Sequence, residues 1–117
     1  MITHIKGSHA DLSDIERELV EERLVVLESL QNGEEAYSCE VEVERSAHHL
    51  NGDVVRVEVV LALRGDVFRA VATRDTLANA LDEVREEITR MVREHRDKKH
   101  TLFKRGARKV RALFGKE

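Results

Sequence analysis

The chain has 117 residues, 41% of them hydrophobic, which is enough for one compact domain with a core and argues against wholesale disorder. Aromatic residues make up only 3% and proline is absent, which argues against a platform that stacks several RNA bases and against a rigid linker between domains. The net charge is −3. The single cysteine excludes an intramolecular disulfide, and no apolar run is long enough to predict a membrane span. A cytoplasmic protein is therefore expected.

The first third of the chain predicts a short strand and then an amphipathic helix. Residues 2–6 carry β-branched side chains and form the strand candidate. Ser13 and Glu16 have the spacing of a capping box, in which each side chain bonds the other residue's free backbone N–H. Apolar residues then recur every three to five positions as far as Leu30, and Gly33 is expected to follow the end of this helix.

The middle of the chain changes to the period of two that is typical of strands. Residues 37–44 alternate apolar side chains with serine and glutamate, and residues 54–64 and 67–73 continue the alternation. An Asn-Gly pair at 51–52 and a Gly-Asp pair at 65–66 supply the residues that tight hairpin turns need. This pattern predicts a three-stranded meander.

From Thr76 the spacing of apolar residues becomes helical again. One stripe falls at steps of three and four and consists of Leu77, Leu81, Val84, Ile88, Met91 and His95. The element order is therefore β-α-β-β-β-α. It predicts an α+β fold, a two-layer sandwich in which a four-stranded sheet carries both helices on one face.

Charge is distributed very unevenly along the chain. Residues 1–60 hold 5 Lys or Arg against 14 Asp or Glu, whereas residues 61–117 hold 15 against 9. We therefore divide the chain into a domain at residues 1–99 and a basic C-terminal tail at residues 100–117. Such asymmetry suggests a C-terminus that faces a polyanion, although a basic tail can also be a merely solvated end.

The tail itself has the pattern of a basic amphipathic helix, with apolar residues at steps of four, three and four: Phe103, Ala107, Val110 and Phe114. Three partners fit this pattern. The tail could become ordered against a nucleic acid or a protein bound to it, lie on a membrane surface, or pack on its own domain or on a second copy. The sequence leaves these alternatives open.

The predicted sheet and the predicted helices differ as binding surfaces. Alternation places four glutamates on the open sheet face: Glu40, Glu42, Glu44 and Glu58. We expect neither basic nor aromatic side chains on this face, so it should repel phosphate. The solvent side of the helices, with the tail, remains as the candidate nucleic-acid surface. Acids between the helical arginines also allow a simpler interpretation, in which ion pairs at i,i+4 serve solubility only.

Three segments carry a family likeness: residues 22–28 on the first helix, residues 76–82 at the start of the second, and the lysine-rich end at 97–99. In order and spacing they resemble the ribosome hibernation-promoting factor family, also called ribosome-associated translation inhibitors or sigma-54 modulation proteins. The likeness extends over about residues 1–99 and is closest to a short form that lacks the dimerising second domain. Val26 and Ala78 depart from the family pattern, which has a basic residue and tyrosine there.

The resemblance implies a factor that binds the small ribosomal subunit near the decoding region and blocks the mRNA and tRNA sites under stress. The implied partner is 16S rRNA, with ribosomal proteins as further candidates, and no membrane or small-molecule substrate is implied. Charge placement and resemblance together predict these rRNA-binding residues: Arg23, Arg85, Arg90, Arg93, Lys98, Lys99, Lys104, Arg105, Arg108 and Lys109.

Catalysis and metal binding are not expected. No histidine pair has the i,i+4 helical spacing of a metal site, and Cys39 is expected to face inward as a core residue. No glycine-rich phosphate loop is present, so we predict neither an enzyme nor a cofactor. The alternative function, from another class, is a protein-interaction module whose basic tail docks on an acidic partner or on a second copy.

Overall fold

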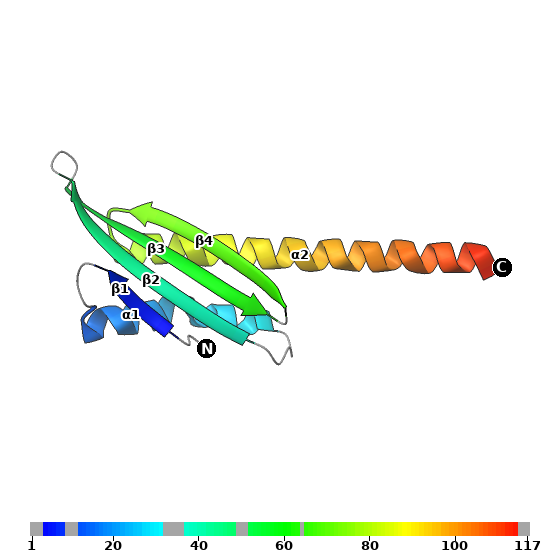
Figure 1. Cartoon of the computed structure of the whole chain (residues 1–117), viewed down its shortest axis with the longest axis horizontal. Coiled ribbons are helices and arrows are strands. Elements are labelled where there is room, and N and C mark those ends of the chain that lie inside the picture. The colour runs from blue at the N-terminus through cyan, green and yellow to red at the C-terminus, as the bar shows by residue number, and fades with distance from the viewer. Residues whose placement is uncertain (1–3, 9–11, 32–36, 49–51, 64, 115–117) are drawn as a thin grey trace.

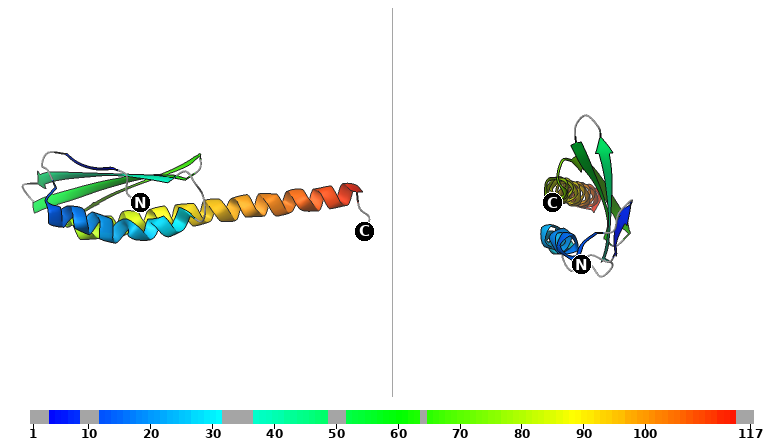
Figure 2. Two further views of the ribbon diagram at one scale, coloured as in Figure 1. Left: turned by 90° about the horizontal axis from the view of Figure 1, so that it is seen from below. Right: turned by 90° about the vertical axis from the view of Figure 1, so that its left-hand side faces the viewer.

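A computed structural model describes residues 4–8, 12–31, 37–48, 52–63 and 65–114. They form the predicted two-layer α+β sandwich (Figure 1). In chain order the elements are β1 (His4–Ser8), α1 (Asp14–Leu24), the 3-10 helix η1 (Val25–Gln31), β2 (Tyr37–His48), β3 (Gly52–Leu63), β4 (Asp66–Arg74) and α2 (Leu77–Phe114). The sheet has the order β1-β2-β3-β4, and both helices cover one of its faces (Figure 2).

The strands pair as the predicted meander, with β1 added in parallel to β2. The β2–β3 hairpin is longer than predicted, because its cross-strand pairing continues past Glu44 as far as His48 and Gly52. β1 is described over His4–Ser8, which is two residues past the predicted end at Lys6, and the first predicted residues, 2–3, lie outside the described residues. The middle of the predicted Asn-Gly turn, residues 49–51, lies outside the described residues. At the second turn Gly65 has φ +90°, a left-handed conformation that glycine adopts without strain.

The first helix begins as predicted but changes its winding. Ser13 Oγ accepts the Glu16 N–H at 3.2 Å, and the Glu16 carboxylate accepts the Ser13 N–H at 3.0 Å, which confirms the capping box. The prediction of a single α-helix as far as Leu30 was wrong, because the α-helix ends at Leu24 and residues 25–31 form a 3-10 helix. The β-branched pair at 25–26 favours an α-helix poorly, and 3-10 winding places residues three apart on one side, so Leu27 and Leu30 are both buried.

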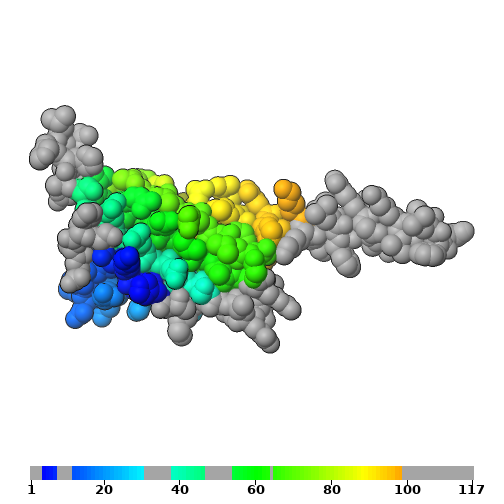
Figure 3. All heavy atoms as spheres, in the orientation of Figure 1, coloured from blue at the N-terminus to red at the C-terminus, as the bar shows by residue number. Residues whose placement is uncertain are grey.

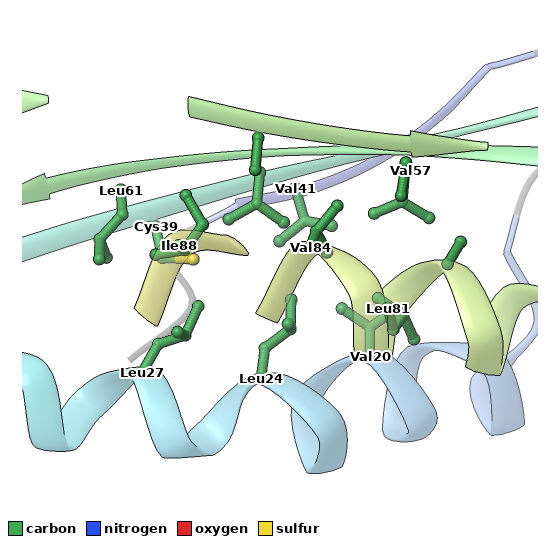
Figure 4. Close-up of a cluster of buried hydrophobic side chains, with 14 of the residues drawn as sticks. Val20, Leu24, Leu27, Cys39, Val41, Val57, Leu61, Leu81, Val84 and Ile88 are labelled. Atoms are coloured by element: carbon green, nitrogen blue, oxygen red, sulfur yellow. The ribbon is translucent and has the colours of Figure 1, made fainter. Parts of the chain in front are cut away.

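One apolar core lies between the sheet and the helices (Figure 4). Side chains from α1 and η1, from α2 and from the inner sheet face meet there, and Leu24, Val57 and Ile88 are each at most 1% exposed. The inward alternation of β2 and β3 is confirmed. The predicted stripe on α2 is buried from Leu77 to Ile88, Met91 is partly buried against the core, and the His95 ring contacts Phe68 edge-on. Val92, which the predicted stripe omitted, is also buried.

The second helix is one continuous element of 38 residues. It begins where the Asn79 N–H donates to the Thr76 hydroxyl at 3.1 Å, so threonine serves as its N-cap. Its first half packs on the sheet beside α1 and η1, and its ribbon then runs beyond the end of the sheet (Figures 1 and 2). The predicted tail is therefore helical as far as Phe114 and is the direct continuation of α2.

Candidate nucleic-acid interface

The outer sheet face carries mixed charges. Its glutamates lie where alternation predicted, but the expected absence of basic side chains was wrong, because Lys6, Arg56 and Arg69 share the face. Arg69 lies 3.1 Å from Glu58 and Arg56 lies 3.6 Å from the same carboxylate. The prediction missed these bases because it considered each strand separately and did not consider which residues of neighbouring strands lie side by side. The space-filling view displays this open face (Figure 3).

Three of the predicted arginines gather on the helix side of the molecule. Arg85, Arg90 and Arg93 line a hollow of about 440 Å³ beside η1, together with Val26 and Thr89. Three carboxylates complete the lining: Glu86, Glu94 and Asp97. The hollow is therefore charge-balanced, with three bases and three acids interspersed along α2.

Two predicted residues converge on one carboxylate. Arg23, in the last turn of α1, donates to both oxygens of Asp82 on α2 at 2.8 Å, and Arg85 lies 3.5 Å from the same side chain. These bonds raise the pKa of the Arg23 guanidinium above its usual value. Arg23 therefore ties the two helices together, a role that the sequence could not indicate because Asp82 lies 59 residues away.

Arg90 and Arg93 differ although they line the same hollow. Arg90 donates to Glu94 at 3.2 Å and pairs with Glu87 one turn before, and both carboxylates raise its pKa. Arg93 is exposed and forms no hydrogen bond or ion pair with any residue that the structure describes. An incoming phosphate can bond Arg93 directly, whereas at Arg90 it must compete with two carboxylates.

The remaining predicted residues lie further along α2. Lys98 is exposed, has no ion-pair partner among the described residues, and lines a separate hollow beside Phe68 and His95. The structure therefore does not bring Lys98 together with Arg93. The other predicted bases are on the helix beyond the sheet, and their side chains lie outside the described set: Lys99, Lys104, Arg105, Arg108 and Lys109.

The structural role of Arg96 was not predicted from the sequence. Arg96 donates to the Leu30 carbonyl near the end of η1, and so connects α2 to η1. Its sequence neighbours give no signal for this role, because the acceptor is a backbone oxygen 66 residues away. Arg96 satisfies a carbonyl that the end of a helix leaves without a partner.

The described part of the chain holds no cluster of side chains suited to a metal ion. No group of three or more His, Cys, Asp or Glu residues there could hold a metal ion. Cys39 is 1% exposed, and burial raises the pKa of its thiol to about 11. Such a thiol carries little thiolate near neutral pH. Among the described helices, none is both long enough and apolar enough to cross a bilayer.

Comparison with known proteins gives a consistent assignment. The fold is similar to the crystal structure of the N-terminal domain of Thermus thermophilus Protein Y, with a TM-score of 0.65 and 23% identity over 80% of this chain and 97% of that one. It is also similar to a ribosomal subunit interface protein from Coxiella burnetii, with a TM-score of 0.67 and 18% identity over 83% and 99% of the two chains. No curated protein matches the sequence significantly. Residues 3–100 match the family model for sigma 54 modulation protein / S30EA ribosomal protein, and the chain belongs to that family.

Proposed function

We propose that this protein is a ribosome-associated hibernation factor that acts in the cytoplasm. It binds the small subunit near the decoding region, occludes the mRNA and tRNA sites, and so silences idle ribosomes. The family to which it belongs includes S30EA ribosomal proteins, and a protein of the same fold is a ribosomal subunit interface protein. Neither catalysis nor a cofactor is needed for this role, since a rigid body of suitable size and charge is sufficient.

The observation that carries the proposal is the gathering of Arg85, Arg90 and Arg93 on the helix side. Arg93 supplies a cation that pairs with no carboxylate among the described residues. α2 continues from it into a segment in which seven of the residues 98–114 are basic. Neutralising rRNA phosphates with these groups releases condensed counterions, so affinity should fall as salt rises. The outer sheet face is a poorer candidate, because each of its described Lys and Arg side chains lies beside a carboxylate: Arg56 and Arg69 beside Glu58, and Lys6 beside Glu42.

The first experiment is co-sedimentation with purified bacterial ribosomes through sucrose gradients, at low and at moderate salt. The parent protein should migrate with the small subunit and with intact ribosomes, and less of it should do so as salt rises. Arg90→Glu combined with Arg93→Glu should release it from both fractions. Each phosphate contact that is lost should lower the slope of log affinity against log salt by about 0.7–0.9.

A matched control changes two bases on the opposite face. Lys6 and Arg69 have side chains that are 64% and 67% exposed. Lys6→Glu combined with Arg69→Glu alters the net charge equally and should leave co-sedimentation nearly unchanged. If the control releases the protein as much as the helix variant does, net charge and not the helix face governs binding. A parent protein that stays at the top of the gradient at low salt would refute ribosome binding itself.

A further inference from the structure

Net charge is divided sharply between the body of the protein and the end of α2. Residues 98–117 hold 8 Lys or Arg against one acid, a net charge of +7, and residues 1–97 hold 12 against 22, a net charge of −10. We call residues 98–114 the extension. Two such molecules attract each other when the extension of one approaches the body of the other, and this attraction requires no nucleic acid.

The extension is an amphipathic helix that has no core of its own. Leu81, Val92, Phe103 and Phe114 are spaced by eleven residues, or three helical turns, so the apolar stripe that packs on the sheet continues along the extension. The sheet ends before the extension does (Figure 2). Because α2 is unbroken, the extension does not fold back onto its own body in this structure, and a second molecule can cover the stripe.

Two acidic surfaces of a second copy could receive the extension. On the outer sheet face, Lys6 lies 4.0 Å from Glu42, and Arg56 and Arg69 neutralise Glu58. The exposed face of α1 differs: four of its carboxylates form no hydrogen bond or ion pair with any described residue, namely Asp14, Glu18, Glu21 and Glu22. These carboxylates can attract a basic helix without losing a partner among the described residues, so charge complementarity favours α1.

The α1 face also offers apolar contacts and sufficient length. Ile15 is 78% exposed and Val25 is 54% exposed, so apolar side chains lie among the acids of the α1 face. The 17 residues of the extension are about 26 Å long at 1.5 Å per residue. The 11 residues of α1 and the 7 of η1 together extend over about 30 Å. The two helical surfaces therefore match in length as well as in charge.

We propose that the free protein forms a dimer in which the extension of each molecule docks on the acidic α1 face of the other. The apolar stripe covers Ile15 and Val25, and the lysines and arginines at its margins pair with Glu18, Glu21 and Glu22. A reciprocal exchange uses both surfaces of both molecules and closes the assembly at two copies. Unlike the ribosomal role, this interaction needs only the protein itself.

The test is sedimentation equilibrium of the nuclease-treated full chain at low salt, with charge reversals on either side of the contact. The parent protein should sediment as a dimer and become monomeric as salt rises. Glu18→Lys with Glu22→Lys should be monomeric at low salt, and so should Arg105→Glu with Lys109→Glu. An equal mixture of these two variants places opposite charges at both contacts and should restore the dimer.

A sheet-face variant serves as the matched control. Glu40→Lys with Glu44→Lys changes the net charge as much as the α1 variant does, and it should remain dimeric. Mixing it with the Arg105→Glu, Lys109→Glu variant should not produce the restored dimer. A monomeric parent protein at low salt would overturn the proposal, as would a mixture of the α1 and extension variants that stays monomeric. Because the assay contains no ribosomes, its outcome is independent of the proposed ribosomal role.

Discussion

At the scale of single residues, the structure separates basic side chains that hold the fold from those that are open to a ligand. Arg23 bonds Asp82 through two 2.8 Å hydrogen bonds, and Arg45 bonds Glu16, so both stabilise contacts within the body. Arg93 has no such partner among the described residues. The number of arginines on a helix therefore overstates its capacity to bind phosphate, because each internal carboxylate competes for the same donors.

The Glu16 carboxylate gives a pH-dependent prediction at this scale. Its hydrogen bond from Arg45, with that from the Ser13 N–H, lowers its pKa from 4.5 to about 2. The unfolded chain binds the proton more readily, so this carboxylate stabilises the fold above about pH 4.5, and the contribution is lost as pH falls toward 2. Glu16→Gln should therefore be less stable than the parent at neutral pH, and the difference should shrink through that window.

Urea denaturation of both proteins at a series of pH values measures this difference. Glutamine is neutral and keeps an oxygen that can accept the Ser13 N–H, so the variant mainly removes the charge-assisted bond to Arg45. A difference in unfolding free energy that stays constant from neutral pH to acid would show that the charge of Glu16 contributes nothing.

At the scale of elements, α2 combines two functions along one helix. Its first half buries Leu81, Val84 and Ile88 against the sheet, each 0% exposed, while the opposite side presents the arginines that line the hollow. Burial of the stripe fixes the rotation of the helix about its axis, and this rotation decides which charged residues face solvent. Core packing and the candidate binding surface are thus set by the same periodicity.

Truncation of a core side chain should show how much α2 depends on this packing. Ile88→Ala should lower the free energy of unfolding by about 2–5 kcal/mol, because it removes a fully buried side chain and leaves a cavity. Ile15→Ala is the matched control: Ile15 is 78% exposed, and the change should stay within about 0.5 kcal/mol. Urea titration of the two variants and the parent gives both values. Equal losses would contradict the assignment of the core.

At the scale of the whole molecule, the long second helix makes the protein elongated. The Cα radius of gyration is 19.0 Å and the principal extents are 69 × 31 × 17 Å. A compact domain of this length would have a radius of about 13 Å. The elongated shape moves the basic end of the chain away from the acidic body, so that a second molecule or a polyanion can reach it.

Small-angle scattering tests this shape directly. At about 0.5 M salt, where screening acts over only a few ångströms, the protein should be monomeric with a radius of gyration near the value of the structure. A radius close to that of a compact domain would mean that the extension folds back onto the body. That result would remove the reason to expect a second copy as its partner.

The sequence alone predicted the fold class because local periodicity and tertiary packing agree in this protein. Alternation fixed the inward residues of β2 and β3, helical spacing fixed the stripe of α2, and the spacing of Ser13 and Glu16 fixed the start of α1. These features depend on residues a few positions apart, which a pattern in the sequence records directly. The gathering of Arg85, Arg90 and Arg93 on one helix face has the same origin.

Only the tertiary structure decided how the charged groups are paired and what lies beyond the core. Arg23 with Asp82 and Arg96 with the Leu30 carbonyl join residues about 60 positions apart, and the bases on the outer sheet face meet their glutamates across strands. The continuity of α2 into the extension was likewise left open by the sequence. Periodicity shows which side of an element is buried, but partners that are distant in the chain are chosen by packing, and packing therefore decided which charges stay free to bind.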